Sequence, residues 1–138
     1  MRFPMRYSRL SRLGLSAAGL GPRRSVVEVA EGYLRIRMGW AFAADIPLHH
    51  VRRAAARTRP VLDCGVHGWR GRWNVNGAFT GLVEVEVDPP IRASAVRFPI
   101  TLREIRFGVD DTDGLLRALD TARGGPRAMA PTAPVASP

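Results

Sequence analysis

The residue types best suited to chemistry gather in one short stretch, where a carboxylate, a thiol and an imidazole occur as Asp63, Cys64 and His67. Two further histidines, His49 and His50, lie upstream. Such groups could hold a metal ion or form a nucleophile–base pair. However, Cys64 and His67 lack the paired spacing of a zinc motif, and Cys64 is the chain's single cysteine. We therefore predict ordinary loop and packing roles, with no metal, cofactor or catalytic residue. A small enzyme or metal site at Cys64 and His67 remains the weakest hypothesis.

A second unusual stretch lies between residues 65 and 77, where two tryptophans and two arginines occur among glycines, at Trp69, Arg70, Arg72 and Trp73. In an extended chain the two tryptophans would share one face and the two arginines the other. The interpretation we favour buries the tryptophans and pairs the arginines with Glu84 and Glu86 across a hairpin. The alternative is a surface that binds an anion or an aromatic ligand.

The positive charge is distributed unevenly along the chain. All 21 basic residues are arginine, and residues 1–24 hold six of them with no acidic residue, a charge of +6. Residues 25–122 hold 13 arginines and all 12 acidic residues, a charge of +1, and residues 123–138 add +2. The six arginines of the N-terminal arm are Arg2, Arg6, Arg9, Arg12, Arg23 and Arg24. An anionic partner would therefore meet the arm before the rest of the chain.

The arm also carries apolar residues at spacings of three and four, namely Phe3, Tyr7, Leu10, Leu13, Ala17 and Leu20. This spacing predicts one amphipathic helix or helical turn that ends at residues 19–22. We favour packing of its apolar stripe on the domain's own sheet, and the alternative is a helix that docks on a membrane surface or a partner. The apolar stretch 13–20 is too short and too rich in Gly and Ser for an export signal. We expect a cytoplasmic protein, with peripheral membrane contact as the variant that the arm suggests.

From residue 25 onward, apolar residues recur with a period of two, which predicts short antiparallel strands. The expected strands cover residues 25–29, 33–38, 40–46, 51–56, 72–76, 82–87, 91–98 and 104–109, with a turn at 30–32 and a helical turn at 48–50. Asn76-Gly77 is a strong hairpin signal between the fifth and sixth of these. Acidic residues at 110–113 offer N-caps for a helix near 113–122. We expect an arm (1–24), one β domain (25–122) and a disordered Ala/Pro-rich tail (123–138).

Many short strands followed by one amphipathic helix resemble a pleckstrin-homology-like barrel. The segments that carry the resemblance are residues 34–40 and the Ile46-Pro47 step into residues 48–51. Residues 67–77, 87–90 and 109–115 are similar to a family of small bacterial proteins with this type of barrel. The resemblance implies a barrel of seven or eight antiparallel strands capped by a C-terminal helix, and it implies no activity. The lipid site of eukaryotic members is not expected here, because the first loop, residues 30–32, is short and acidic.

These observations rank three hypotheses about function. The first is a non-catalytic binding or scaffolding module for a protein partner, for self-association or for an anionic membrane surface. The second is nucleic-acid binding through the arm and the Trp/Arg segment, which the nearly neutral β domain makes less favourable. The third is the small enzyme.

Overall fold

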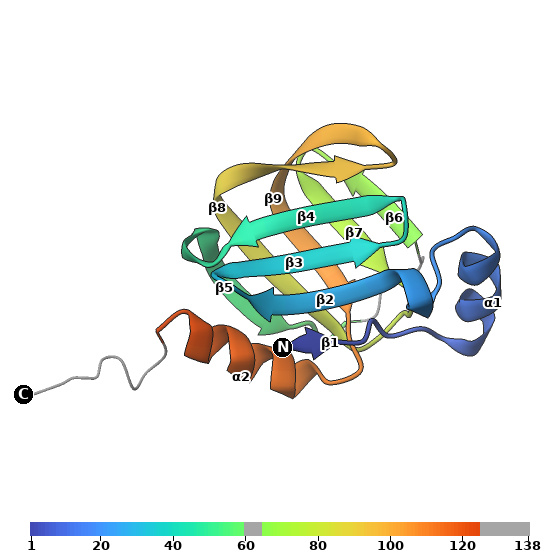
Figure 1. The fold of residues 1–138 in the computed structure, drawn as a ribbon, viewed down its shortest axis with the longest axis horizontal. Helices are drawn as coiled ribbons and strands as arrows, with labels where there is room; N and C mark the ends of the chain where they lie inside the picture. The colour runs from blue at the N-terminus through green and yellow to red at the C-terminus, as the bar shows by residue number, and fades with distance from the viewer. Residues whose placement is uncertain (60–64, 125–138) are drawn as a thin grey trace, which may run out of the picture.

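A computed structural model describes residues 1–59 and 65–124 of the chain. Cys64 and the predicted tail beyond residue 124 lie outside the described residues. The fold is mainly β and ends in one helix, as the sequence predicts (Figure 1). The strands are β1 (Arg2–Phe3), β2 (Ser25–Ala30), β3 (Tyr33–Met38), β4 (Phe42–Pro47), β5 (Val51–Ala56), β6 (Gly65–Trp69), β7 (Arg72–Asn76), β8 (Leu82–Ala95) and β9 (Phe98–Gly108). The helices are α1 (Arg9–Ala17) and α2 (Thr112–Ala122), with short 3-10 turns η1 (Pro22–Arg24) and η2 (Leu48–His50).

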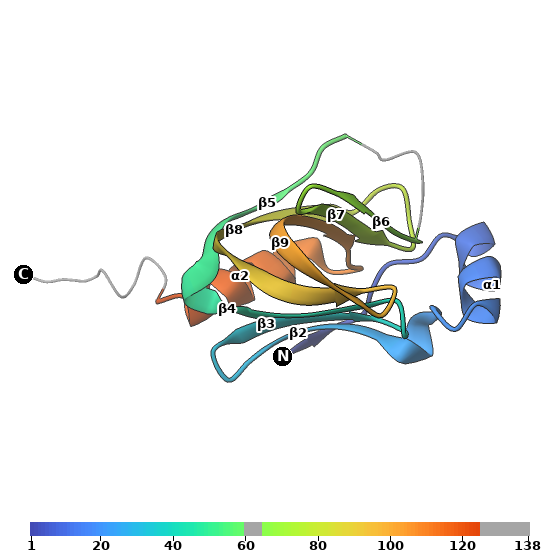
Figure 2. The ribbon, with the colours of Figure 1, turned by 90° about the horizontal axis from the view of Figure 1, so that it is seen from above.

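The described strands form one strongly bent sheet with the order β1-β2-β3-β4-β8-β9-β7-β6, and β5 pairs with β8 from outside this path. Figure 2 shows the two layers that result, with β2, β3 and β4 in one and β5, β6 and β7 in the other. Strand β8 connects them, because its last residues pair with β4 and its first residues pair with β5. The space between the layers is filled by fully buried side chains that include Leu34, Ile36, Phe42 and Phe107.

The sheet is open, in contrast to the closed barrel that the resemblance implies. Among the described strands, β1 pairs only with β2, and β6 pairs only with β7. The N-terminal arm crosses the open side. After β1, Met5 forms an isolated β-bridge with Val109, and Tyr7 forms one with Gly77. Phe3 and Met5 are buried in the common core. Because the arm fills the open side, the two edges need not meet.

Helix α2 begins and packs as its sequence predicts. The Asp111 side chain accepts a hydrogen bond from the backbone N–H of Gly114 at 2.9 Å, which caps the N-terminus. Leu115 and Leu119 are fully buried, so the apolar face of the helix lies against the sheet. Its contacts are with β2 and β5, on the open side of the sheet (Figure 1).

The predicted hairpin of residues 72–76 with 82–87 is wrong. Strand β7 pairs with β6 in an antiparallel hairpin and with β9 in parallel, so β8 is not its neighbour. The turn of the real hairpin is Arg70-Gly71, where both residues take positive φ angles of 53° and 86°. Gly77 serves another purpose, since the ring of Tyr7 lies within 2.4 Å of where a Cβ would be. Two other predicted boundaries also differ: β8 continues through residues 88–90, and the next turn lies at residues 96–97 instead of Pro99.

The predicted arm helix is too long, and its packing differs from the interpretation we favoured. The helical part is α1 alone, and Phe3 and Met5 before it lie in extended segments. Phe3 and Leu20 reach the core as expected. Leu10 and Leu13, in contrast, are 86% and 75% exposed, and no residue of α1 is buried. The apolar stripe of the helix is therefore not used by the domain's own core.

Candidate functional site

Tyr7 fixes the position of α1 on the sheet. Its hydroxyl donates a hydrogen bond to the carbonyl of Leu20 at 2.5 Å and lies 2.8 Å from the Ser25 hydroxyl. The next residue, Ser8, caps the helix and its backbone N–H donates to the carbonyl of Gly77 at 2.9 Å. Burial raises the pKa of Tyr7, and the hydrogen bond with Ser25 opposes that rise only in part. The half-buried side chain of Tyr7 thus links the residues just before α1 to those just after it.

Helix α1 exposes Leu10 and Leu13 to solvent. At about 100° per residue, Leu10, Leu13 and Ala17 fall on one face, with Arg9 and Arg12 on its flank. Ser11 and Leu15, on the opposite face, are the half-buried positions that touch the domain. The exposed apolar stripe therefore faces solvent, where it is available to a partner.

Two turns of the sheet extend this apolar surface. The indole N–H of Trp40 donates to the carbonyl of Ala18 at 2.7 Å, so the β3–β4 turn touches the end of α1. The Arg97 guanidinium lies 5.6 Å from the Trp40 ring centroid, which joins the β8–β9 turn to the same surface. Trp40, Val96 and Phe98 are 45%, 44% and 69% exposed. Figures 1 and 2 both show α1 and these two turns at the same end of the molecule. We call this surface the arm end: α1, the turn 39–41 and the turn 96–98.

The arm end carries arginines without acidic partners. Among the described residues, Arg9, Arg12 and Arg97 of this surface and Arg23 and Arg24 of the adjoining η1 make no ion pair, while the side chain of Arg6 lies beside Gly81. Three of them, Arg12, Arg23 and Arg24, line a hollow of about 310 Å³ between α1 and η1. No acidic residue occurs in α1, in η1 or in the turns 39–41 and 96–98. A dianionic or monoanionic group would meet only positive side chains here.

The acids of the domain body are, by contrast, occupied. Glu84 on β8 accepts hydrogen bonds from Arg106 at 2.6 Å and Arg57 at 3.0 Å. These bonds, that with Arg106 foremost, lower the pKa of Glu84. Asp45 likewise pairs with Arg37 at 2.8 Å. The arginines of the sheet's outer face are thus used internally, which leaves those of the arm end for external anions.

The Trp/Arg segment forms a second and separate surface. Trp69 is 74% exposed at the β6–β7 turn, and the Arg70 guanidinium lies 5.6 Å from the centroid of its ring. Arg72 contacts Glu104 at 3.9 Å. The predicted pairing of Arg70 and Arg72 with Glu84 and Glu86 is wrong, because β9 lies between β7 and β8.

In an uninterrupted strand Trp69 and Trp73 would lie on the same face, but in this structure they do not. In the hairpin register Trp69 pairs with Arg72 and Gly68 with Trp73, so the two tryptophans point to opposite faces. Trp73 is half-buried, and its ring lies 6.4 Å from that of Phe42. Only a glycine fits at Gly68, because a Cβ there would lie 2.0 Å from the Trp73 ring. The predicted burial of both tryptophans is therefore wrong for Trp69, which is exposed, whereas Trp73 packs half-buried against the core.

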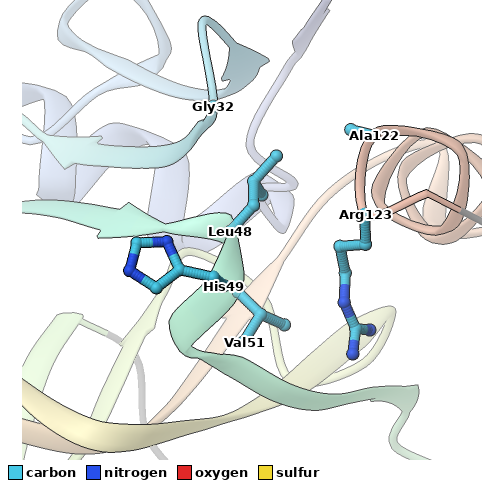
Figure 3. A pocket seen from close by; sticks show the side chains of 6 residues that line it. All are labelled: Gly32, Leu48, His49, Val51, Ala122 and Arg123. Carbon is cyan, nitrogen blue, oxygen red and sulfur yellow. The ribbon is translucent and has the colours of Figure 1, made fainter.

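The three histidines lie in two places, His49 and His50 in η2 and His67 in β6. His49 and His50 lie in η2, as the sequence predicts, with ring centroids 4.6 Å apart, and the Nδ1 of His50 lies 2.8 Å from the carbonyl oxygen of Pro89. Figure 3 shows the hollow of about 460 Å³ beside them, where His49 and Arg123 lie on opposite sides of Leu48 and Val51. Among the described residues no three His, Cys, Asp or Glu side chains gather closely enough to hold a metal ion. His67 is exposed on β6, and its predicted neighbour Cys64 lies outside the described residues.

Comparison with known proteins adds nothing to the geometry described above. No family model, curated protein or solved structure matches this chain. Within the described residues, neither helix has the length and apolar content needed to cross a bilayer.

Four residues of the two surfaces were not predicted as site residues. Trp40, Arg97 and Phe98 lie at the arm end, and Arg103 lines the hollow beside Trp69. Their neighbours are distant in sequence, since Trp40 contacts Ala18 and Arg97, and the backbone N–H of Arg103 donates to the carbonyl of Gly71. The available signal was the absence of acids from residues 89–103, which contain Arg97 and Arg103.

Proposed function

We propose that this protein is a non-catalytic module that binds anionic membrane surfaces through the arm end, on the cytoplasmic side, with its open sheet as an incomplete relative of the pleckstrin-homology-like barrel. The observation that carries the proposal is the exposure of Leu10 and Leu13 on α1 beside arginines that have no acidic partner. An interfacial helix places leucines at the acyl boundary and arginines among the headgroups.

The other side chains of the arm end suit the same environment. Trp40 and Phe98 are large exposed aromatics beside the helix, and aromatic rings favour the interface between headgroups and acyl chains. The hollow lined by Arg12, Arg23 and Arg24 offers guanidinium groups to a lipid phosphate. A short helix with leucines on one face and arginines on its flank has the composition of a helix that lies in an anionic membrane interface.

The energies favour reversible binding. Each arginine near an anionic leaflet contributes about 1 kcal/mol, and each buried leucine contributes about 1.5–3 kcal/mol at most. With four arginines and two leucines the sum is of order 7–10 kcal/mol, from which the entropy of association must be subtracted. We therefore expect weak, salt-sensitive attachment, since the screening length falls to about 8 Å at physiological salt.

The test is co-sedimentation with vesicles of phosphatidylcholine alone or mixed with phosphatidylserine. We expect binding to the anionic vesicles, weakened by salt, and at least about tenfold weaker binding for Leu10→Ser with Leu13→Ser. Arg9→Gln with Arg12→Gln should cost about tenfold or more. Arg117→Gln on α2 and Trp69→Ser at the other surface are the matched controls and should bind as the unchanged protein does.

Equal binding to neutral and anionic vesicles, or none to either, would refute the proposal. If the controls lose as much vesicle binding as the arm-end variants do, binding depends on the overall charge and hydrophobicity of the protein and not on the arm end.

A further inference from the structure

The β6–β7 turn builds a hollow that the membrane proposal does not use. The hollow has a volume of about 510 Å³, within the range of small-ligand sites. Its lining includes Gly68, Trp69, Arg70, Trp73, Thr101 and Arg103. None of its lining residues belongs to the arm end as defined above. A ligand here would therefore be recognised separately from the membrane.

The turn is held in a conformation that costs free energy. Arg70 takes a φ of 53°, a left-handed conformation that L-residues other than Gly, Asn and Asp rarely adopt. Its neighbour Gly71 is fixed to β9, because its carbonyl accepts hydrogen bonds from the backbone N–H groups of Arg103 at 2.8 Å and Glu104 at 3.1 Å. A Cβ on Gly71 would lie 2.8 Å from the Arg103 side chain. The turn therefore holds Trp69, Arg70 and Arg103 together before any ligand arrives.

The chemistry of the lining selects the ligand. The Arg70 guanidinium lies over the Trp69 ring, 5.6 Å from its centroid, but Trp69 remains 74% exposed, which leaves aromatic surface on which a planar base can stack. Arg70 and Arg103 supply cationic N–H donors, and the lining contains no carboxylate. An anion is therefore favoured, whereas an uncharged sugar would find Thr101 as the only side-chain acceptor in the lining.

We propose that this hollow binds a nucleoside phosphate, whose base stacks on Trp69 and whose phosphate is bound by Arg103 and Arg70. The ligand is either a free nucleotide or one unit of a single-stranded nucleic acid, since both present the same base and phosphate.

Calorimetric titration of the whole protein tests this proposal with four probes: adenosine 5′-monophosphate, adenosine, inorganic phosphate and an oligoadenylate single strand. The monophosphate should bind at least about tenfold more tightly than adenosine or phosphate alone, because the two contacts add. Trp69→Leu should weaken the monophosphate about tenfold or more, the range measured for lost base stacking. Arg103→Gln should weaken it while leaving adenosine unchanged.

The controls are Tyr33→Leu, which removes an exposed aromatic ring from β3, and Arg117→Gln, which removes an arginine from α2; both should bind as the unchanged protein does. Tighter binding of the oligoadenylate than of the monophosphate identifies a single strand as the ligand, and equal binding identifies a free nucleotide. The proposal is overturned if phosphate binds as tightly as the monophosphate and Trp69→Leu changes nothing, or if neither the monophosphate nor the oligoadenylate binds.

Discussion

Removing one hydroxyl, by Tyr7→Phe, tests how the arm is held against the sheet. The change deletes the bond to the Leu20 carbonyl at 2.5 Å and the contact with the Ser25 hydroxyl at 2.8 Å, and it leaves the ring in place over Gly77. A typical intramolecular hydrogen bond contributes about 0.5–1.5 kcal/mol net. Because the Ser25 hydroxyl already lies 3.4 Å from the same carbonyl, it can take over part of the loss. We expect the free energy of unfolding to fall by about 1–2 kcal/mol.

The pH dependence of the same variant has a definite sign. Burial raises the pKa of Tyr7 above its ordinary value of 10.0, so the folded protein holds this proton more tightly than the unfolded chain does. The stabilisation is therefore complete below pH 10 and declines as the pH rises through the folded pKa. The advantage of the unchanged protein over Tyr7→Phe should shrink above pH 10, at no more than about 1.4 kcal/mol per pH unit.

Urea unfolding of both proteins, followed by circular dichroism between pH 7 and 11, measures both effects. At neutral pH the midpoint of thermal unfolding should also fall, by about 3–8 °C for a chain of this size. Tyr33→Phe is the control, because Tyr33 is an exposed tyrosine of β3 and its loss should change the free energy of unfolding by less than about 0.5 kcal/mol. If Tyr7→Phe is as stable as the unchanged protein at pH 7 and tracks it to pH 11, the argument that Tyr7 anchors the arm is wrong.

Two further changes probe the sheet and the hairpin. Glu84→Gln should lower the free energy of unfolding by about 1–2 kcal/mol at pH 7, a modest loss because the pair is partly exposed. Since the pKa of Glu84 is lowered in the folded state, urea titrations should show this difference begin to shrink as the pH falls below the ordinary pKa of 4.5 and vanish below the folded pKa. Gly68→Ala should cost about 1–3 kcal/mol and alter the near-ultraviolet circular dichroism of Trp73, because the new methyl group meets the ring. Its control is Gly14→Ala on α1, where a Cβ meets nothing within 4 Å and should stabilise the helix by up to about 1 kcal/mol; a neutral Gly68→Ala would contradict the packing described.

The strands that alternate cleanly were predictable, and those that depend on distant partners were not. Residues 25–29 and 33–38 have the period of two that a half-buried strand needs, and each lies in a strand of the structure, the first of which also includes Ala30. Strand β6 was not predicted because glycines interrupt its strand pattern. Its pairing with β7 depends on the Arg70-Gly71 turn, and arginine is not a usual residue at such a turn. The parallel pairing of β7 with β9 joins residues about thirty positions apart, which no local pattern can specify.

The prolines of β8 and the apolar residues of the arm misled the prediction for different reasons. Pro89 and Pro90 read as a strand end, but they lie where the β8–β9 register shifts, and a bulge tolerates missing N–H donors. In the arm, Phe3, Met5 and Tyr7 also alternate with a period of two, which competes with the helical spacing of three and four. The sheet edge decided between the two periods, since β1 pairs with β2 and buries Phe3.

The two proposed surfaces follow from how the fold distributes its acids. On the outer face of the sheet, Glu84, Glu104 and Asp45 are paired with arginines, so these cations are satisfied within the protein. In the two hollows, by contrast, Arg12, Arg23, Arg24, Arg70 and Arg103 make no ion pair with an acid of the described residues, which leaves these arginines to external anions. Because the two surfaces share no lining residue, the membrane variants at Leu10 and Leu13 should bind a nucleotide normally. A protein that lost both activities through either set of variants would instead have one continuous basic surface, and the separation argued from the ion pairs would be wrong.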